Sequence, residues 1–135
     1  MDRITADQRS DIMRRIKSRD TSPEMTVRRL VHGMGYRYRL HVKELPGSPD
    51  LVFPGRRKVI FVHGCFWHRH PKCRFSTTPK TRVAYWQEKF EKNIARDKRN
   101  LKELKKNRWK FLVIWQCEIK DKNSLKKRIA CFLED

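Results

Sequence analysis

The organisation of this chain is decided by the stretch V-I-F-V-H-G-C-F-W-H-R-H-P-K-C, which runs from Val59 to Cys73. It begins as a short apolar strand, Val59 to Val62. It then continues without a break into three histidines, two cysteines and two adjacent aromatic residues. The chain has only five histidines and four cysteines, so packing alone does not explain such crowding. The stretch predicts a strand that delivers a metal-stapled loop and a catalytic or nucleic-acid-contacting edge to its end.

Length and charge narrow the class of protein. A chain of 135 residues predicts one domain. Its formal net charge is +19, and a folded domain so basic repels itself unless it meets a polyanion, so DNA or RNA is the expected partner. No apolar run approaches the roughly 20 residues of a membrane span, and the first residues lack a signal-peptide core. We therefore expect a cytoplasmic protein without a membrane partner, whose cysteines serve metal binding in preference to disulfides.

The spacing of apolar residues predicts an α/β order of elements. Helices are expected over Thr5–Ser18, from Thr21 to about Gly35, over Thr81–Lys106 and over Asn123–Leu133. Strands are expected over Tyr36–Leu40, in a hairpin of Asp50–Phe53 and Lys58–Val62, and over Phe111–Trp115, which reads as a buried central strand. This order predicts a mixed sheet flanked by helices.

The pattern Cys65-x4-His70-x2-Cys73 places three metal ligands in one short loop. A tetrahedral zinc site needs a fourth ligand, and Cys117, just past the strand 111–115, is the best choice. Cys131 and His68 are the alternatives, although Cys131 also reads as an inert thiol of the core. Four protein ligands leave no position open for water, so such a zinc would be structural.

A second set of residues has the chemistry of phosphodiester cleavage, which needs a nucleophilic water and neutralised phosphate charge. Magnesium held by carboxylates supplies both. Asp50 begins a core strand, Val62 ends the neighbouring strand, and Glu24 begins a helix that could pack over both. This is the arrangement of PD-(D/E)xK nucleases, but the expected Glu/Gln-x-Lys reads Phe61-Val62-His63, so the usual acid and lysine are missing.

The sequence leaves structural readings of several of these residues open. Glu24 could only complete a helix cap, and His63 could be a satisfied core histidine. Asp97 falls on the apolar face of the long helix, where it could pair with an arginine or orient a histidine. The adjacent Phe66 and Trp67 cannot both point inward from a strand.

Several motifs spread over nearly the whole chain belong together. They are L-P-G-S-P-D at 45–50, I-F-V-H-G-C-F-W-H at 60–68, K-N-I-x-R-D at 92–97, V-I-W-x-C at 113–117, and R-S-x-x-M-R-x-I and R-D-T at 9–16 and 19–21. With these motifs the chain closely resembles the very short patch repair (Vsr) endonuclease family. The run H-G-C-F-W-H is the most specific of them.

The resemblance implies a restriction-endonuclease-like, PD-(D/E)xK-type α/β fold with one structural zinc. Family members nick one strand of duplex DNA, with magnesium, beside T:G mismatches that arise from 5-methylcytosine deamination, and so initiate very short patch repair. Residues 1–135 would form one endonuclease domain, with 1–20 a helical segment that contacts DNA. The family is functionally paired with a cytosine-5 DNA methyltransferase and allows a mismatch-repair scaffold protein as a partner. We expect a monomer associated with the nucleoid of a bacterium or archaeon.

The resemblance also implies which residues would hold magnesium, of which we expect two ions. Asp50 would bridge them. Val62 would contribute its backbone carbonyl where the family commonly has threonine, and a main-chain ligand tolerates that change. His63 and Glu24 would hold waters of the magnesium shell.

The remaining roles concern the proton and the DNA. His68 would be the general base, oriented by Asp97, and the near-neutral pKa of histidine suits this task. Phe66 and Trp67 would insert into the base stack beside the mismatch, with Met13 entering from the other groove.

Further residues would hold the loop and contact the DNA backbone. The implied zinc ligands are Cys65, His70, Cys73 and Cys117. Lys89, Lys92 and Arg14 are candidate DNA-binding residues, although Lys89 and Lys92 could be solvated charges of a helix. Two other functions remain open: a zinc-stabilised DNA-binding module without catalysis, which would need none of the catalytic set, and a nuclease of the same fold for another lesion.

Overall fold

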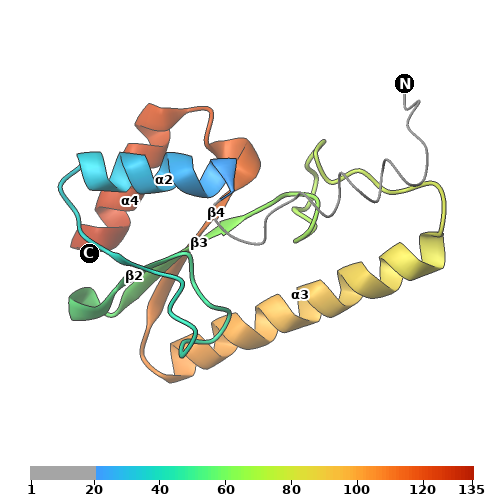
Figure 1. Cartoon of the computed structure of the whole chain (residues 1–135), viewed down its shortest axis with the longest axis horizontal. Coiled ribbons are helices and arrows are strands. Elements are labelled where there is room, and N and C mark those ends of the chain that lie inside the picture. Colours follow the sequence, from blue (N-terminus) through green and yellow to red (C-terminus); the bar gives the residue numbers. More distant parts are fainter. Residues whose placement is uncertain (1–20) are drawn as a thin grey trace.

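A mixed sheet lies between helices on its two faces (Figure 1). The structure, a computed structural model, describes residues 21–135. The strands are β1 (Arg39–Leu40), β2 (Leu51–Phe53), β3 (Lys58–His63) and β4 (Lys110–Trp115), and they lie in the sheet in the order β1-β2-β3-β4. The helices are α2 (Ser22–Gly33), α3 (Val83–Lys106) and α4 (Lys122–Glu134). Short 3-10 turns lie at Pro54–Arg56 and Gln116–Glu118. Strands β1, β2 and β3 pair antiparallel, whereas β3 and β4 are parallel. The predicted mixed sheet flanked by helices is thus confirmed.

Alternation of side chains along the hairpin gives the sheet two apolar faces. Leu51 and Ile60 belong to a buried cluster with α2 and α4. Val52 and Val59 point to the opposite face and pack with Leu104 of α3. The core therefore consists of two clusters, one on each side of the sheet.

The start and end of α2 follow from its sequence. The Thr21 side chain accepts a hydrogen bond from the Glu24 amide at 3.4 Å, and Pro23 occupies the first turn, where its missing N–H is harmless. Gly35 lies just past the helix with φ +96°, a conformation that glycine adopts without strain. This cap places Glu24, which is itself buried, in the first turn of the helix.

Helix α3 extends well beyond the sheet (Figure 1). Its C-terminal half covers the sheet, and its N-terminal half supports the loop 64–82 that follows β3. The Phe66 and Phe90 ring centroids lie 5.3 Å apart, and the Asn93 side-chain amide donates to the Trp67 carbonyl at 3.2 Å. The histidine- and cysteine-rich loop is therefore packed along a helix.

Three expectations about the elements need correction. Strand 110–115 is not central: among residues 21–135 it pairs only with β3, and it reads as apolar because both of its faces are covered. The strand expected over Tyr36–Leu40 shrinks to Arg39–Leu40, because Tyr36 and Tyr38 pack against the α2–α4 cluster instead. Cys131 is exposed, since the buried face of α4 is formed by other positions. The helix expected over Thr5–Ser18 lies outside the described residues.

Within residues 21–135, no helix combines the length and apolar character that crossing a membrane requires.

Candidate functional site

One pocket of about 460 Å³ gathers the residues that the sequence singled out for cleavage chemistry. They reach it from α2, the start of β2, the end of β3, the following loop and α3. The pocket is lined by Glu24, Asp50, Val62, His63, His68 and Asp97, with Arg96 and Asn100 among its other residues. The sequence analysis did not assign a role to Arg96 or Asn100.

Asp50 lies where the hairpin enters the core. The Val62 amide donates to its Oδ2 at 2.6 Å, which ties Asp50 to the end of β3. Burial raises the pKa of Asp50 to about 7; the Val62 hydrogen bond opposes this shift, and the nearby Glu24 adds to it. Ligand atoms of Asp50, Glu24 and His41 lie within 4.8 Å of one another. A buried carboxylate (Glu24) this close to a half-buried one (Asp50) favours a proton or a bound cation between them.

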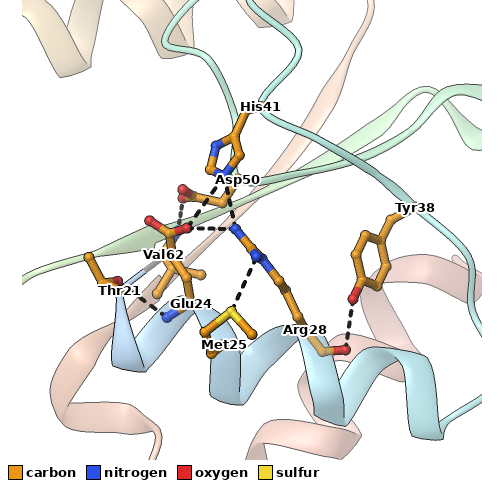
Figure 2. A network of polar contacts seen from close by, with 8 residues as sticks. All are labelled: Thr21, Glu24, Met25, Arg28, Tyr38, His41, Asp50 and Val62. Atoms are coloured by element: carbon orange, nitrogen blue, oxygen red, sulfur yellow. Dashed lines mark hydrogen bonds and ion pairs between the residues drawn. The ribbon is translucent and has the colours of Figure 1, made fainter. Parts of the chain in front are cut away.

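Two basic side chains that the sequence analysis missed contact Glu24 outside the lining of the pocket (Figure 2). Arg28 Nη2 lies 3.1 Å from Glu24 Oε2 and 2.8 Å from His41 Nε2. His41 Nε2 is 3.8 Å from the same Glu24 oxygen. The i,i+4 spacing of Glu24 and Arg28 was a usable signal for one contact. Nothing local in the sequence pointed His41 toward α2.

The predicted pairing of His68 with Asp97 is present. His68 Nδ1 lies 2.6 Å from Asp97 Oδ2. The His63 ring stacks on the His68 ring with a centroid separation of 3.9 Å and an angle of 6° between planes. Burial, aided by His68, lowers the pKa of His63 to about 4, so His63 is neutral near pH 7.

The four expected zinc ligands also come together. The ligand atoms of Cys65, His70, Cys73 and Cys117 all lie within 4.8 Å of one another. His70 Nδ1 is 3.4 Å from the Cys117 sulfur and 3.8 Å from the Cys65 sulfur. Zinc with Zn–S bonds of about 2.3 Å would place sulfurs about 3.8 Å apart in a tetrahedron, so the spacing of these atoms fits such an ion.

The thiols of this cluster influence one another. Burial, followed by the neighbouring thiols, raises the pKa of Cys117 to about 12, and burial also raises the pKa of Cys65. Desolvation opposes ionisation of Cys73 too, but hydrogen bonds from the Phe75 amide and His70 outweigh it and lower the pKa of Cys73 to about 7. Three thiolates side by side need a cation to offset their repulsion, so the donor set suits a metal.

An aromatic cluster lies beside the pocket. Phe66 and Trp67 are half-buried, and their rings meet edge-on at 5.1 Å. Trp86 of α3 packs against both, with centroids 5.8 Å from each. The sequence analysis gave Trp86 no role beyond its place in the helix expected over Thr81–Lys106. The Lys89 ammonium lies 5.3 Å from the Trp67 ring centre.

The other predicted DNA contacts are less informative. The exposed Lys92 forms a surface ion pair with Glu88 at 3.0 Å. Met13 and Arg14 lie outside the described residues.

Comparison with known proteins gives a consistent result. A family profile described as DNA mismatch endonuclease Vsr matches residues 1–74. The type II nicking enzyme V.XorIIP of Xanthomonas oryzae pv. oryzae is 48% identical over 133 residues, which are 98% of this chain and 97% of that protein. The DNA mismatch endonuclease Vsr of Escherichia coli is 41% identical over 117 residues, 87% of this chain and 74% of that protein. The type II nicking enzyme V.NmeAIP of Neisseria meningitidis is 40% identical over 95% of this chain and 91% of that protein.

Proposed function

The chain belongs to the DNA mismatch endonuclease Vsr family, and on that basis we propose that it nicks one strand of duplex DNA beside T:G mismatches in a magnesium-dependent reaction. Membership of the family makes it a hydrolase that cuts DNA internally. The finer proposal is carried by one observation: a single pocket holds paired carboxylates and a histidine–aspartate pair. The mismatch would arise from 5-methylcytosine deamination, and the nick would initiate very short patch repair.

His68 is the proposed general base. Its contact with Asp97 assigns the ring proton to Nδ1, so Nε2 can take a proton from an attacking water. Asp97 also offsets the positive charge that His68 acquires. The stacked His63 fixes the plane of the His68 ring, and because His63 is neutral it adds no second positive charge beside it.

The carboxylates are proposed to hold magnesium. Asp50, Glu24 and the Val62 carbonyl offer the hard oxygen donors that this ion prefers, and the two carboxylates are already adjacent. Magnesium bound there would neutralise charge on the scissile phosphate and lower the pKa of a water. The Val62 amide holds the Asp50 carboxylate, whereas Glu24 and His63 line the pocket where they can hydrogen-bond water. Two ions remain our expectation.

Phe66 and Trp67 are proposed to open the DNA. A T:G wobble pair stacks weakly, so inserting an aromatic ring beside it requires less energy than at a matched pair. Trp86 and Lys89 support the wedge, Trp86 by ring packing and Lys89 with a positive charge near the rings. Insertion of Met13 from the other groove is part of the same proposal.

Other parts of the proposal concern zinc and the chain as a whole. One structural zinc would join Cys65, His70, Cys73 and Cys117 and so fix the loop that carries the wedge and His68. We further propose that residues 1–135 act as one monomeric domain, with 1–20 contacting the DNA. Arg14 and Lys92 would contact the DNA backbone. The proposed partners are a mismatch-repair scaffold protein and, through a functional pairing, a cytosine-5 DNA methyltransferase.

A nicking assay tests the proposal. Duplexes that differ only in one T:G or T:A pair are incubated with protein and magnesium, beside an Asp50→Ala variant. We expect one nick in the mismatched strand, none in the matched duplex, and loss of cutting in the variant. Equal cutting of both duplexes, or undiminished cutting by Asp50→Ala, would refute it. Binding without any cut would favour the zinc-stabilised binding module instead.

A further inference from the structure

Four neighbouring side chains form one connected series: Asp50 and Glu24, which line the pocket, and Arg28 and His41, which do not (Figure 2). We propose that Arg28 and His41 are positioning residues, which hold the Glu24 carboxylate oriented beside Asp50 so that the two carboxylates bind a divalent cation. The inference rests on the proposed function of this pocket. It assigns a role to two residues that need not touch cation or DNA.

The geometry of Arg28 is strongly determined. Its side chain and that of Glu24 are buried, with residue exposures of 8% and 3%, and a buried charge needs a partner. The guanidinium contacts Glu24 Oε2 at 3.1 Å and donates from Nη1 to the Met25 sulfur at 3.2 Å. The Tyr38 hydroxyl donates to the Arg28 carbonyl at 3.1 Å. These contacts set the position of the charge relative to Glu24.

His41 holds the other side of the guanidinium. Since a guanidinium offers only donors, the 2.8 Å contact means that His41 Nε2 accepts a hydrogen bond from Arg28. His41 has φ +49°, a left-handed backbone conformation that residues other than glycine seldom adopt. Such a residue persists where its surroundings over-determine it, often at functional sites. The segment after β1 thus brings a neutral acceptor to Arg28.

The charges explain why Glu24 needs Arg28 and His41 beside it. Glu24 and Asp50 repel each other when both are ionised, and a guanidinium 3.1 Å from Glu24 offsets part of that repulsion. Neither Arg28 nor His41 lines the pocket, so the positive charge that offsets the repulsion lies on the side of Glu24 that faces away from the pocket. The oxygen-lined face of the pocket therefore stays available to an incoming cation. Partners that orient metal ligands from outside typically change metal affinity or activity about 10–100-fold when mutated.

The test compares variants of the full-length, zinc-loaded protein. Arg28→Met removes the charge at similar length. His41→Leu removes the acceptor, whereas His41→Gln retains one near the position of Nε2. Magnesium binding is measured by titration calorimetry, and single-turnover nicking of a T:G duplex is measured across magnesium concentrations. Thermal melts monitored by circular dichroism check folding.

We expect Arg28→Met to weaken magnesium binding about 10–100-fold and to raise the half-saturating magnesium concentration equally, with a smaller change in the nicking rate at saturation. His41→Leu should shift both in the same direction, and His41→Gln should restore most of the affinity. A merely structural role would instead lower the melting temperature and leave the magnesium affinity of the folded protein unchanged.

Several results would overturn the inference. Wild-type magnesium affinity in folded Arg28→Met removes the role of Arg28, and wild-type affinity in His41→Leu removes that of His41. If Arg28→Met does not fold, the test rests on the two His41 variants. Equal magnesium affinities in His41→Leu and His41→Gln would contradict the positioning role. A wild-type protein that binds no magnesium also overturns it. Magnesium binding without nicking of the T:G duplex would count against the proposed function alone.

Discussion

Asp50 is placed where its ionised form destabilises the magnesium-free protein. Its pKa in the folded protein is about 7, raised by burial above the ordinary value of 3.8. Below pH 3.8 the carboxyl is protonated in both the folded and unfolded states. Between pH 3.8 and 7 only the folded state retains the proton, so stability falls by about 1.4 kcal/mol per pH unit. We therefore predict that Asp50→Asn removes a pH-dependent loss of stability.

The magnitude follows from that window. From pH 5 to pH 7 the loss covers two pH units, or about 3 kcal/mol, and above pH 7 it stays constant. Asn keeps a carbonyl oxygen that can accept from the Val62 amide, so the substitution removes the charge and preserves the hydrogen bond. Because Glu24 contributes to the raised pKa of Asp50, we expect the advantage of Asp50→Asn over wild type to grow by about 1–3 kcal/mol between pH 5 and pH 8.

Urea unfolding measures this difference, in magnesium-free buffer with reductant and with zinc retained. Asp121→Asn is the matched control, because exposed Asp121 caps α4 by accepting from the Ser124 amide and Asn can do the same. Its effect should be the same at both pH values. Adding magnesium at pH 8 should stabilise wild type and not Asp50→Asn. If Asp50→Asn shows the same advantage at pH 5 and pH 8, ionisation of Asp50 does not destabilise the folded protein.

Three further substitutions test other parts of the site. Asp97→Asn should lower the single-turnover nicking rate at least about 100-fold while leaving duplex binding nearly unchanged, because His68 loses its tautomer and its counter-charge; a rate within a few-fold of wild type would remove Asp97 from the reaction. Cys117→Ser should abolish stoichiometric zinc, measured by elemental analysis, and lower the melting temperature; full zinc content would show that another ligand is used. Trp67→Ala should weaken binding of T:G duplex more than matched duplex in gel-shift titrations, and equal losses would contradict the wedge.

The parts of the fold that sequence predicts are those specified locally. The hairpin of Leu51–Phe53 and Lys58–His63 follows from two short apolar runs and a Pro-Gly turn. Capping residues fix the start of α2, and apolar spacing fixes α3 to within two residues of its predicted start. The sequence predicted strand 110–115 to be central, but it lies at the edge of the sheet. An apolar run indicates that both faces of a strand are covered, and it does not indicate whether a second strand pairs with it.

The residues of the site also differ in whether the local sequence specifies them. Asp50, Val62 and His68 could be predicted because motifs mark them and strand ends place them near one another. The i,i+4 spacing could have paired Arg28 with Glu24, but the contact of Arg28 with His41 could not be predicted, since it depends on how α2 and the segment after β1 pack together. Long basic side chains are common throughout this chain, so only the three-dimensional contacts distinguish Arg28 from a solvated arginine.

The topology explains why the cysteine–histidine cluster and the pocket lie together. Parallel pairing sets His63 opposite Trp115, so the chain leaves β3 and β4 at the same edge, and Cys117 reaches the loop that carries the other ligands. Trp115 then contacts both sites: its ring stacks on His70 at 4.3 Å and meets His63 edge-on at 5.2 Å. Loss of the proposed zinc would therefore disturb the histidines and the pair Phe66–Trp67 first. Asp50 is held by the Val62 amide within the hairpin, so its position does not depend on that loop.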